Sequence, residues 1–105
     1  MKTVNSAGVA DTFMVSAKPG YLEYAMCANT GVADLWFCLV DKATAPVHLD
    51  VPLAIVAVPA GTNNTIECGK KGLRCNKGIA LCVSTAAAAV TLPTTTAAFF
   101  TAEYS

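Results

Sequence analysis

The stretch Asp34-Leu35-Trp36-Phe37-Cys38-Leu39-Val40-Asp41 decides the fold of this 105-residue chain. Because side chains alternate between the two sides of a β-strand, it predicts a strand over residues 34–41 with two apolar faces. One face carries Leu35, Phe37 and Leu39, and the other carries Trp36, Cys38 and Val40. A sandwich strand with one face in water has no such pattern. We therefore expect the Trp36 face to be covered by a neighbouring loop or buried in an interface.

Short segments rich in β-branched and aromatic residues lie on both sides of this strand, separated by turns of proline, glycine and asparagine. They are too short for capped helices. The expected strands cover residues 11–17, 21–28, 34–41, 51–58, 62–68, 79–84 and 97–103. The pattern predicts an all-β fold, a single-domain antiparallel β-sandwich of jelly-roll or immunoglobulin-like type with about seven or eight strands.

Four other segments carry expectations of their own. In the strand over residues 21–28, the inward face is expected to carry Leu22, Tyr24, Met26 and Ala28. Residues 69–78 hold four of the seven basic residues and three glycines, which predicts an exposed loop. Residues 85–96 contain four consecutive alanines but end in proline and threonines, so we expect an extended arm or thin strand. Residues 1–10 are expected to form an N-terminal arm.

The composition limits the kinds of partner. Only 13% of the residues are charged and 54% are apolar, against about 25% charged residues in typical globular proteins. Part of the surface is therefore expected to contact protein. The net charge is zero, which gives no basic field for nucleic acid. The apolar stretch from Val51 to Ala60 contains two prolines and falls short of the roughly 20 residues that cross a bilayer. We expect neither nucleic-acid nor membrane partners.

The cysteines indicate the redox environment. The five cysteines form no Cys-x-x-Cys pair, and the first residues lack the apolar segment of a secretory signal. We therefore expect small, mostly buried, free thiols in a chain made in a reducing compartment. A secreted domain with two disulfides and one spare thiol is the alternative. The cysteines are Cys27, Cys38, Cys68, Cys75 and Cys82.

The search for chemistry predicts no enzyme. The single histidine, His48, lies near Asp50, but no serine sits in a Gly-x-Ser-x-Gly turn, so a hydrolytic triad is not supported. A zinc site can be drawn from Cys68, Cys75, Cys82 and His48. Its cysteines have six residues between neighbours, more than the two to four typical of structural zinc. We expect no catalytic, cofactor-binding or metal-binding residues.

Several apolar and aromatic residues are candidates for contact with a partner. Trp36 and Val40 lie on the second apolar face of the strand over residues 34–41, and Val90 and Leu92 lie in the segment of small residues. Tyr104 lies next to the end of the chain. A ligand-binding or sugar-binding module is the competing expectation, because Tyr21, Trp36 or Tyr104 could stack on a ligand.

Several motifs together resemble a group of small β-sandwich virion proteins of tailed bacteriophages. The aromatic strand ends in Asp41-Lys42-Ala43-Thr44-Ala45-Pro46, the turn Pro59-Ala60-Gly61 follows, and a strand led by Gly78-Ile79 ends in Ser84-Thr85. The resemblance covers residues 18–105. It implies a capsid decoration or cement protein, or a small tail-associated component, without catalytic residues.

The resemblance also implies partners and a location. It suggests a homo-oligomer, with a trimer as the expected state, that contacts a major capsid protein at the surface of the virion after synthesis in the host cytoplasm. The five cysteines and the loop with Lys70-Lys71 depart from the pattern of the group. Residues 1–17 match nothing in it. The N-terminal arm and the segment of residues 85–96 are the candidates for exchange between neighbouring copies.

Overall fold

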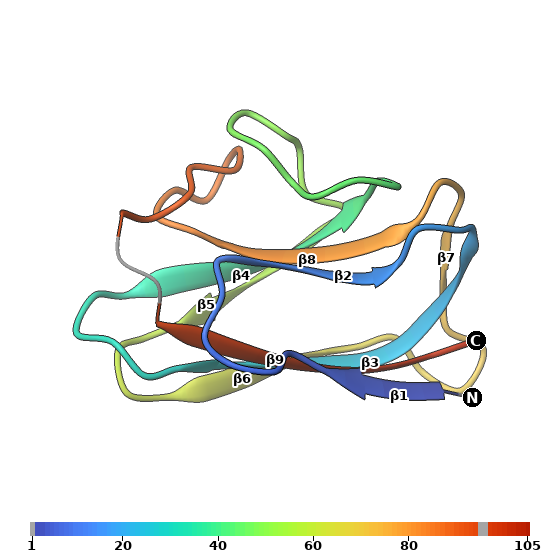
Figure 1. Cartoon of the computed structure of the whole chain (residues 1–105), viewed down its shortest axis with the longest axis horizontal. Helices are drawn as coiled ribbons and strands as arrows, with labels where there is room; N and C mark the ends of the chain where they lie inside the picture. Colours follow the sequence, from blue (N-terminus) through green and yellow to red (C-terminus); the bar gives the residue numbers. More distant parts are fainter. Residues whose placement is uncertain (1, 95–96) are drawn as a thin grey trace.

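Two antiparallel β-sheets pack face to face in the computed structural model, which describes residues 2–94 and 97–105 (Figure 1). The strands of sheet A lie in the order β1 (Lys2–Asn5), β9 (Ala98–Tyr104), β3 (Gly20–Asn29) and β6 (Asn63–Glu67), and the short β7 (Leu73–Cys75) also pairs with β3. The strands of sheet B lie in the order β2 (Thr12–Ser16), β8 (Ile79–Ser84), β4 (Leu35–Asp41) and β5 (Ala54–Val58). The predicted β-sandwich is confirmed.

The strand pairing identifies the topology. β1 pairs with β9, β2 with β8, β3 with β6 and β4 with β5. Apart from the short β7, these pairs are nested: the first strand meets the last, the second meets the last but one, and so on inward. Nested pairing is the order of a jelly roll, so the structure decides between the two sandwich types that the sequence left open.

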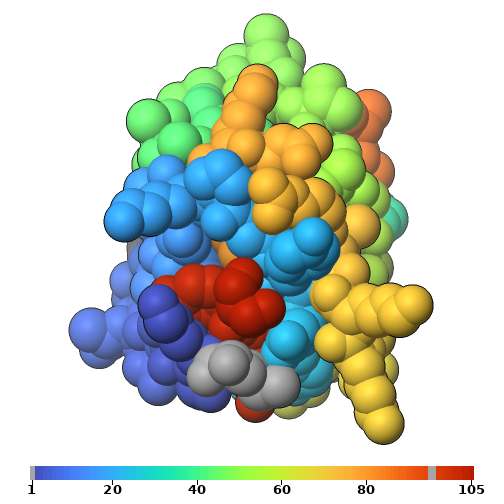
Figure 2. Space-filling model, turned by 90° about the vertical axis from the view of Figure 1, so that its right-hand side faces the viewer, coloured from blue at the N-terminus to red at the C-terminus, as the bar shows by residue number. Residues whose placement is uncertain are grey.

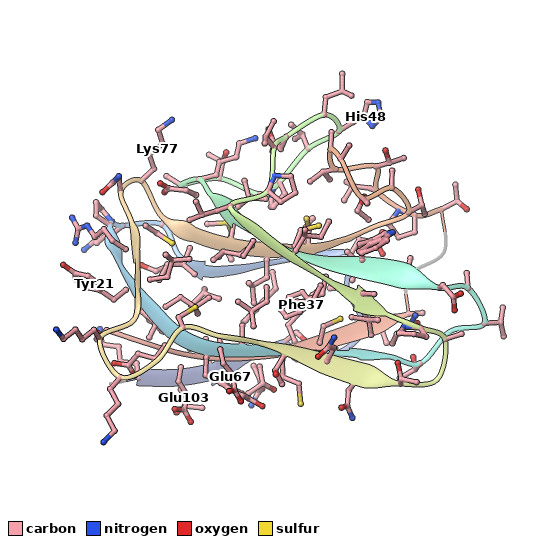
Figure 3. The ribbon with its side chains drawn as sticks, turned by 180° about the vertical axis from the view of Figure 1, so that it is seen from behind. Tyr21, Phe37, His48, Glu67, Lys77 and Glu103 are labelled. Carbon is pink, nitrogen blue, oxygen red and sulfur yellow. The ribbon has the colours of Figure 1, made fainter. Side chains whose placement is uncertain are left out.

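The main core fills the space between the sheets. Phe37 of β4 and Phe100 of β9 meet there, with ring centroids 5.8 Å apart. Phe13 of β2 also stacks on Phe100, with ring centroids 6.2 Å apart. Leu35, Phe37 and Leu39 all face this core, which confirms the predicted inner face of the strand. Phe37 is labelled between the two sheets in Figure 3.

The predicted inner face of β3 is wrong beyond Leu22. The pairing of β3 with β9 is irregular between Leu22 and Tyr24. Such a bulge moves each side chain after it to the face opposite the one that simple alternation predicts. Leu22 is therefore buried as expected, but after it the buried positions are Ala25, Cys27 and Asn29. Tyr24, Met26 and Ala28 lie outside the core, against expectation.

The N-terminal segment is not the arm that the sequence suggested. Residues 2–5 form β1 at the edge of sheet A and pair with β9 of the same chain, while residue 1 lies outside the described part. Val4 packs against the core, and the Phe100 N–H donates to the Ser6 hydroxyl at 3.0 Å. The first residues thus complete the sandwich of their own chain.

Two other segments differ in detail from the sequence expectation. The expected strand over residues 51–58 begins only at Ala54. The loop over residues 69–78 is exposed at its lysines but contains β7, whose Cys75 is buried. This loop protrudes beside the chain ends in Figure 2. Among the described residues, no helix is long and apolar enough to cross a membrane.

Candidate interaction surface

The outer face of sheet B carries a second apolar cluster. Cys38 and Val40 of β4 lie there beside Ala80 and Cys82 of β8, and Val90 packs over them from the segment of residues 85–92. All five side chains are buried. Of the two explanations for the Trp36 face of β4, the structure shows the first, because a loop of the same chain covers much of this face.

Two loops form a layer over sheet B, the segment of residues 85–92 and the connection of residues 42–53. The Leu49 N–H donates to the Val90 carbonyl, and the Val90 N–H donates to the Asp50 carbonyl, both at 2.8 Å. The Ser84 hydroxyl accepts the Thr91 N–H at 2.9 Å and the Ala86 N–H at 3.1 Å. The two backbone hydrogen bonds between Leu49, Val90 and Asp50 fix one loop against the other.

The connection presents apolar side chains to solvent. We call residues 46–53 the crest; they belong to the loop that stands above sheet B and appears in green at the top of Figure 2. Their large apolar side chains are exposed: Val47 by 51%, Leu49 by 67%, Val51 by 75% and Leu53 by 46%. His48 is also exposed here and points away from the sandwich in Figure 3.

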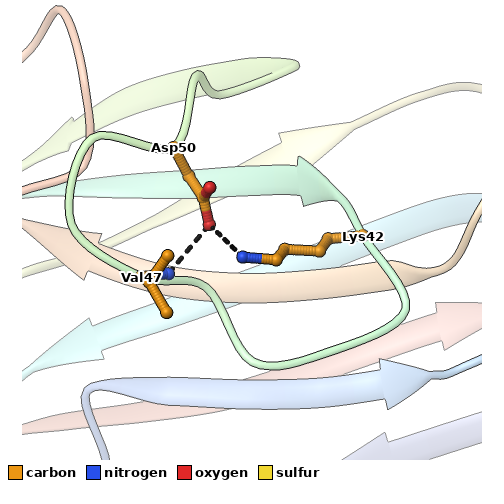
Figure 4. A network of polar contacts seen from close by, with 3 residues as sticks. All are labelled: Lys42, Val47 and Asp50. Atoms are coloured by element: carbon orange, nitrogen blue, oxygen red, sulfur yellow. Dashed lines mark hydrogen bonds and ion pairs between the residues drawn. The ribbon is translucent and has the colours of Figure 1, made fainter.

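Asp50 anchors the crest to the end of β4 (Figure 4). Its Oδ2 atom accepts hydrogen bonds from the Lys42 ammonium and from the Val47 N–H, each at 2.8 Å. The hydrogen bond from Lys42 and the one from Val47 hold the pKa of the Asp50 carboxyl below its ordinary value. A carboxylate with two such donors closes the turn and fixes its geometry.

Leu49, at the tip of the crest, adopts an unusual backbone conformation. Its φ is 73°, and it is the single non-glycine residue with positive φ in the described part of the chain. For an L-residue other than glycine or asparagine this region costs about 1–2 kcal/mol. Its leucine side chain is nevertheless 67% exposed. Strain of this kind at an exposed apolar tip suggests a functional role for the tip.

The predicted interface residues do not form one surface. Val40 and Val90 are enclosed in the cluster on sheet B, so their side chains have no surface left for a partner in this conformation. Trp36 and Leu92 lie at the margin of that cluster and are half-buried. Tyr104 is on sheet A, where it packs against the main core with the Lys2 ammonium 5.9 Å from its ring centre.

Sequence reasoning missed the crest as a surface. It assigned Val51 and Leu53 to a strand, where their alternation would have placed them on one face of a sheet. The usable signal was the set of apolar residues at 47, 49, 51 and 53 beside two prolines, in a connection too long for a hairpin. Apolar residues in a connection with no strand partner are exposed unless another element covers them.

A hollow of about 340 Å³ lies on the outer face of sheet A. Tyr24 stands in it, directly opposite Glu67 on one neighbouring strand and Glu103 on the other. Figure 3 shows Glu67 and Glu103 on the same outer side of sheet A, and β3 lies between their two strands. Glu23 also lines the hollow, and its Oε2 atom is buried without a hydrogen-bond partner among the described residues. The hollow combines an aromatic ring with carboxylates.

The structure does not assemble the zinc site that the sequence allowed. Cys82 lies in the cluster outside sheet B, Cys75 lies in the main core, and His48 lies on the exposed crest. Within residues 2–94 and 97–105, no group of three or more His, Cys, Asp or Glu side chains is placed to hold a metal ion.

The cysteines are mostly buried, as predicted. All five are unpaired thiols, and Cys68 alone is partly exposed. Burial raises the pKa of Cys27 to about 12 and that of Cys75 to about 11. Their thiolate fraction near neutral pH is therefore very small.

Comparison of the chain with family models, with curated proteins and with solved structures finds no match.

Proposed function

We propose that this chain is a structural virion protein of a tailed bacteriophage, a decoration or cement protein that stabilises the head lattice. In this proposal the chain has no enzymatic activity and is made in the host cytoplasm. It forms a homotrimer on the capsid surface, where it contacts the major capsid protein. The observation that carries the proposal is the crest, with four exposed apolar side chains on a loop held by its own hydrogen bonds.

The crest has the properties of a contact surface. Exposed apolar groups gathered in one place are typical of sites that bind another protein. Because Asp50 and the Val90 backbone already fix the loop, docking would order few additional groups. A preorganised loop loses little conformational entropy on binding, which favours affinity. The low charge of the chain, 13% of its residues, is consistent with a surface partly reserved for protein.

The fold gives support by analogy only. Jelly rolls occur in viral capsid proteins, and they also occur in lectins and in other families. A fold of this kind hosts many unrelated functions, so it does not by itself select one of them. The sequence resemblance to phage virion proteins and the crest together make the capsid role the better supported choice.

Light scattering coupled to size-exclusion chromatography of the reduced protein tests the proposal. We expect the mass of a trimer for the wild type and of a monomer for the double variant Leu49→Asn, Val51→Thr. Asparagine tolerates positive φ, so the variant removes apolar surface without straining the tip further. Val32→Thr is the matched control, because Val32 is fully exposed in a different turn, and it should remain trimeric.

Two results would count against the crest as the contact surface. One is a wild type that stays monomeric at every concentration, and the other is a double variant that keeps the wild-type oligomer. For the capsid contact, the wild type should sediment with phage heads assembled without it, and the double variant should stay in solution. Equal sedimentation of the two proteins would remove the crest from the proposal.

A sugar-binding or ligand-binding module, including a tail-associated receptor-binding component, is the second candidate. The hollow on sheet A favours it, because Tyr24 offers a ring for stacking and the flanking carboxylates of Glu67 and Glu103 accept hydrogen bonds. A monomeric wild type whose Tyr24 resonances shift on addition of a neutral oligosaccharide would support this reading over the capsid role.

A further inference from the structure

We propose that Cys38 and Cys82 form a dithiol site, which a small-molecule disulfide such as oxidised glutathione converts into a disulfide bond across the centre of sheet B. The two cysteines are direct register partners on the adjacent antiparallel strands β4 and β8. No other two cysteines are register partners in the strand pairs that the structure describes. The inference goes beyond the proposed function and does not depend on it.

Neighbouring hydrogen bonds show that Cys38 and Cys82 form a hydrogen-bonded pair of the antiparallel ladder, in which the backbone groups of the two residues face each other. The Leu39 carbonyl accepts the Leu53 N–H on the β5 side, and the Val83 N–H donates to the Asp11 carbonyl on the β2 side. Backbone groups of successive strand residues point to opposite sides, so those of Cys38 and Cys82 point toward each other. In such a hydrogen-bonded pair the Cα atoms are about 5.5 Å apart, within the range of protein disulfides.

Both side chains lie on the same face of the sheet. They belong to the apolar cluster on the outer side of sheet B, whereas Cys27 and Cys75 belong to the main core. In a hydrogen-bonded pair the Cβ atoms are about 5.5 Å apart, and a disulfide needs about 3.8 Å. The bond must therefore draw the strands together locally, which makes it easy to reduce.

The chemistry is a thiol–disulfide exchange in two steps. The thiolate of one cysteine attacks a sulfur of the small disulfide and releases one small thiol, leaving a mixed disulfide on the protein. The second cysteine then attacks the protein sulfur of that mixed disulfide and releases the second small thiol. The two cysteine protons end on the two released thiols. The protein pair is oxidised by two electrons and the small disulfide is reduced.

The segment of residues 85–92 controls access to the site. Cys38, Cys82 and Val90 all have zero exposure, and Val90 packs in the same cluster as the two thiols. The first attack therefore requires this segment to lift away from the sheet. Replacement of Val90 with alanine removes part of the cover and leaves the backbone bonds to the crest in place.

Intact mass spectrometry and thiol counting test the proposal. The reduced protein, incubated with oxidised glutathione, should lose two hydrogens, about 2 Da, and keep three of its five alkylatable thiols. Peptide mapping should assign the bond to Cys38 and Cys82. Val90→Ala should react several-fold faster, and dithiothreitol should restore all five thiols. Cys38→Ser and Cys82→Ser should abolish the loss, while the control Cys68→Ser should retain it.

Three outcomes would overturn the proposal. A bond mapped to Cys68 and Cys75 would place the reactive pair in the other sheet. Glutathione that stays attached to one cysteine would show that the second thiol cannot reach the mixed disulfide. A Val90→Ala variant that stays folded and keeps five thiols throughout would show that the pair does not close even without its full cover.

Discussion

Asp50 holds the crest through one carboxylate oxygen that two donors share. Lys42 and the Val47 N–H both donate to it, and the pKa of the carboxyl is below its ordinary value for that reason. The unfolded chain therefore binds a proton at a higher pH than the folded chain does. This contribution to stability is complete above the unfolded pKa, about 3.9, and is lost as the pH falls through the folded value.

The variant Asp50→Asn should remove this pH-dependent part of the stability. We expect it to lower the free energy of unfolding at pH 7 by about 1 kcal/mol or less, because the ion pair is partly exposed. The difference from wild type should shrink as the pH falls below about 4. Urea unfolding at several pH values measures this difference. Asp34→Asn, which keeps its acceptor for the Ala60 N–H, is the control and should change little.

A difference between wild type and Asp50→Asn that stays constant from pH 7 to pH 2 would contradict this account. Asp41, the other carboxylate with a lowered pKa, does not affect this comparison of wild type with Asp50→Asn. Burial acts to raise its pKa, but the N–H donors of Lys77, Asn76 and Gly78 lower it on balance. Its stabilising effect is therefore also lost in acid, but equally in both proteins, so it cancels from their difference.

At the scale of the element, β1 and the short β7 are the two strands that the sequence did not reveal, and β1 is the longer of them. It is four residues long, lies at the edge of sheet A and pairs only with β9 among the described strands. Val4 is its one side chain packed on the core. Val4→Ser should lower the free energy of unfolding by about 1 kcal/mol, part of the value of a fully buried valine.

Urea unfolding of Val4→Ser measures this effect, and Thr3→Ser is the control because Thr3 is exposed. Limited proteolysis should also cut the N-terminal segment faster in Val4→Ser than in wild type. If protease removed residues 1–5 from the wild type without any change in its unfolding midpoint, β1 would contribute nothing to the stability of its own sandwich, which would contradict this account.

The inner face of a strand could be predicted where its side chains alternate without interruption. The stretch from Leu35 to Leu39 placed its inner face correctly because every second residue is large and apolar. In β3 the same rule failed after Leu22, because the bulge depends on pairing with β9. β1 has one apolar residue in four, and it is a strand only because the edge of β9 is there to pair with it.

The candidate site was harder to predict than the strands. The sequence indicated that a loop or an interface covers the Trp36 face of β4, and it could not show that Val90 packs on that face. That contact forms because the connection of residues 42–53 and the segment of residues 85–92, which are far apart in sequence, meet above sheet B. The exposure of Leu49 depends on the same meeting, since the Val90 backbone holds the crest with Leu49 pointing outward. Contacts between loops leave no periodic pattern in a sequence.

At the scale of the whole molecule, nested pairing makes the last strand a central one. β9 lies between β1 and β3, and its Phe100 contacts the aromatic rings of both Phe13 and Phe37. Both ends of the described chain meet there, since Lys2 is the register partner of Tyr104 (Figure 1). The core is therefore incomplete until the final residues are in place.

Removal of residues 97–105 should abolish cooperative unfolding, because it exposes an edge of β3 and leaves a cavity where Phe100 was. Loss of a buried phenylalanine alone costs about 3–5 kcal/mol, a large part of the stability of a small domain.

Removal of Ser105 alone is the control for the truncation of residues 97–105. It loses the two backbone hydrogen bonds with Tyr21, at 2.8 and 3.0 Å, and should only lower the midpoint. Thermal unfolding followed by near-ultraviolet circular dichroism distinguishes the two truncations. A cooperative transition in the longer truncation would mean that sheet B and β3 form a core without β9, which nested pairing does not allow.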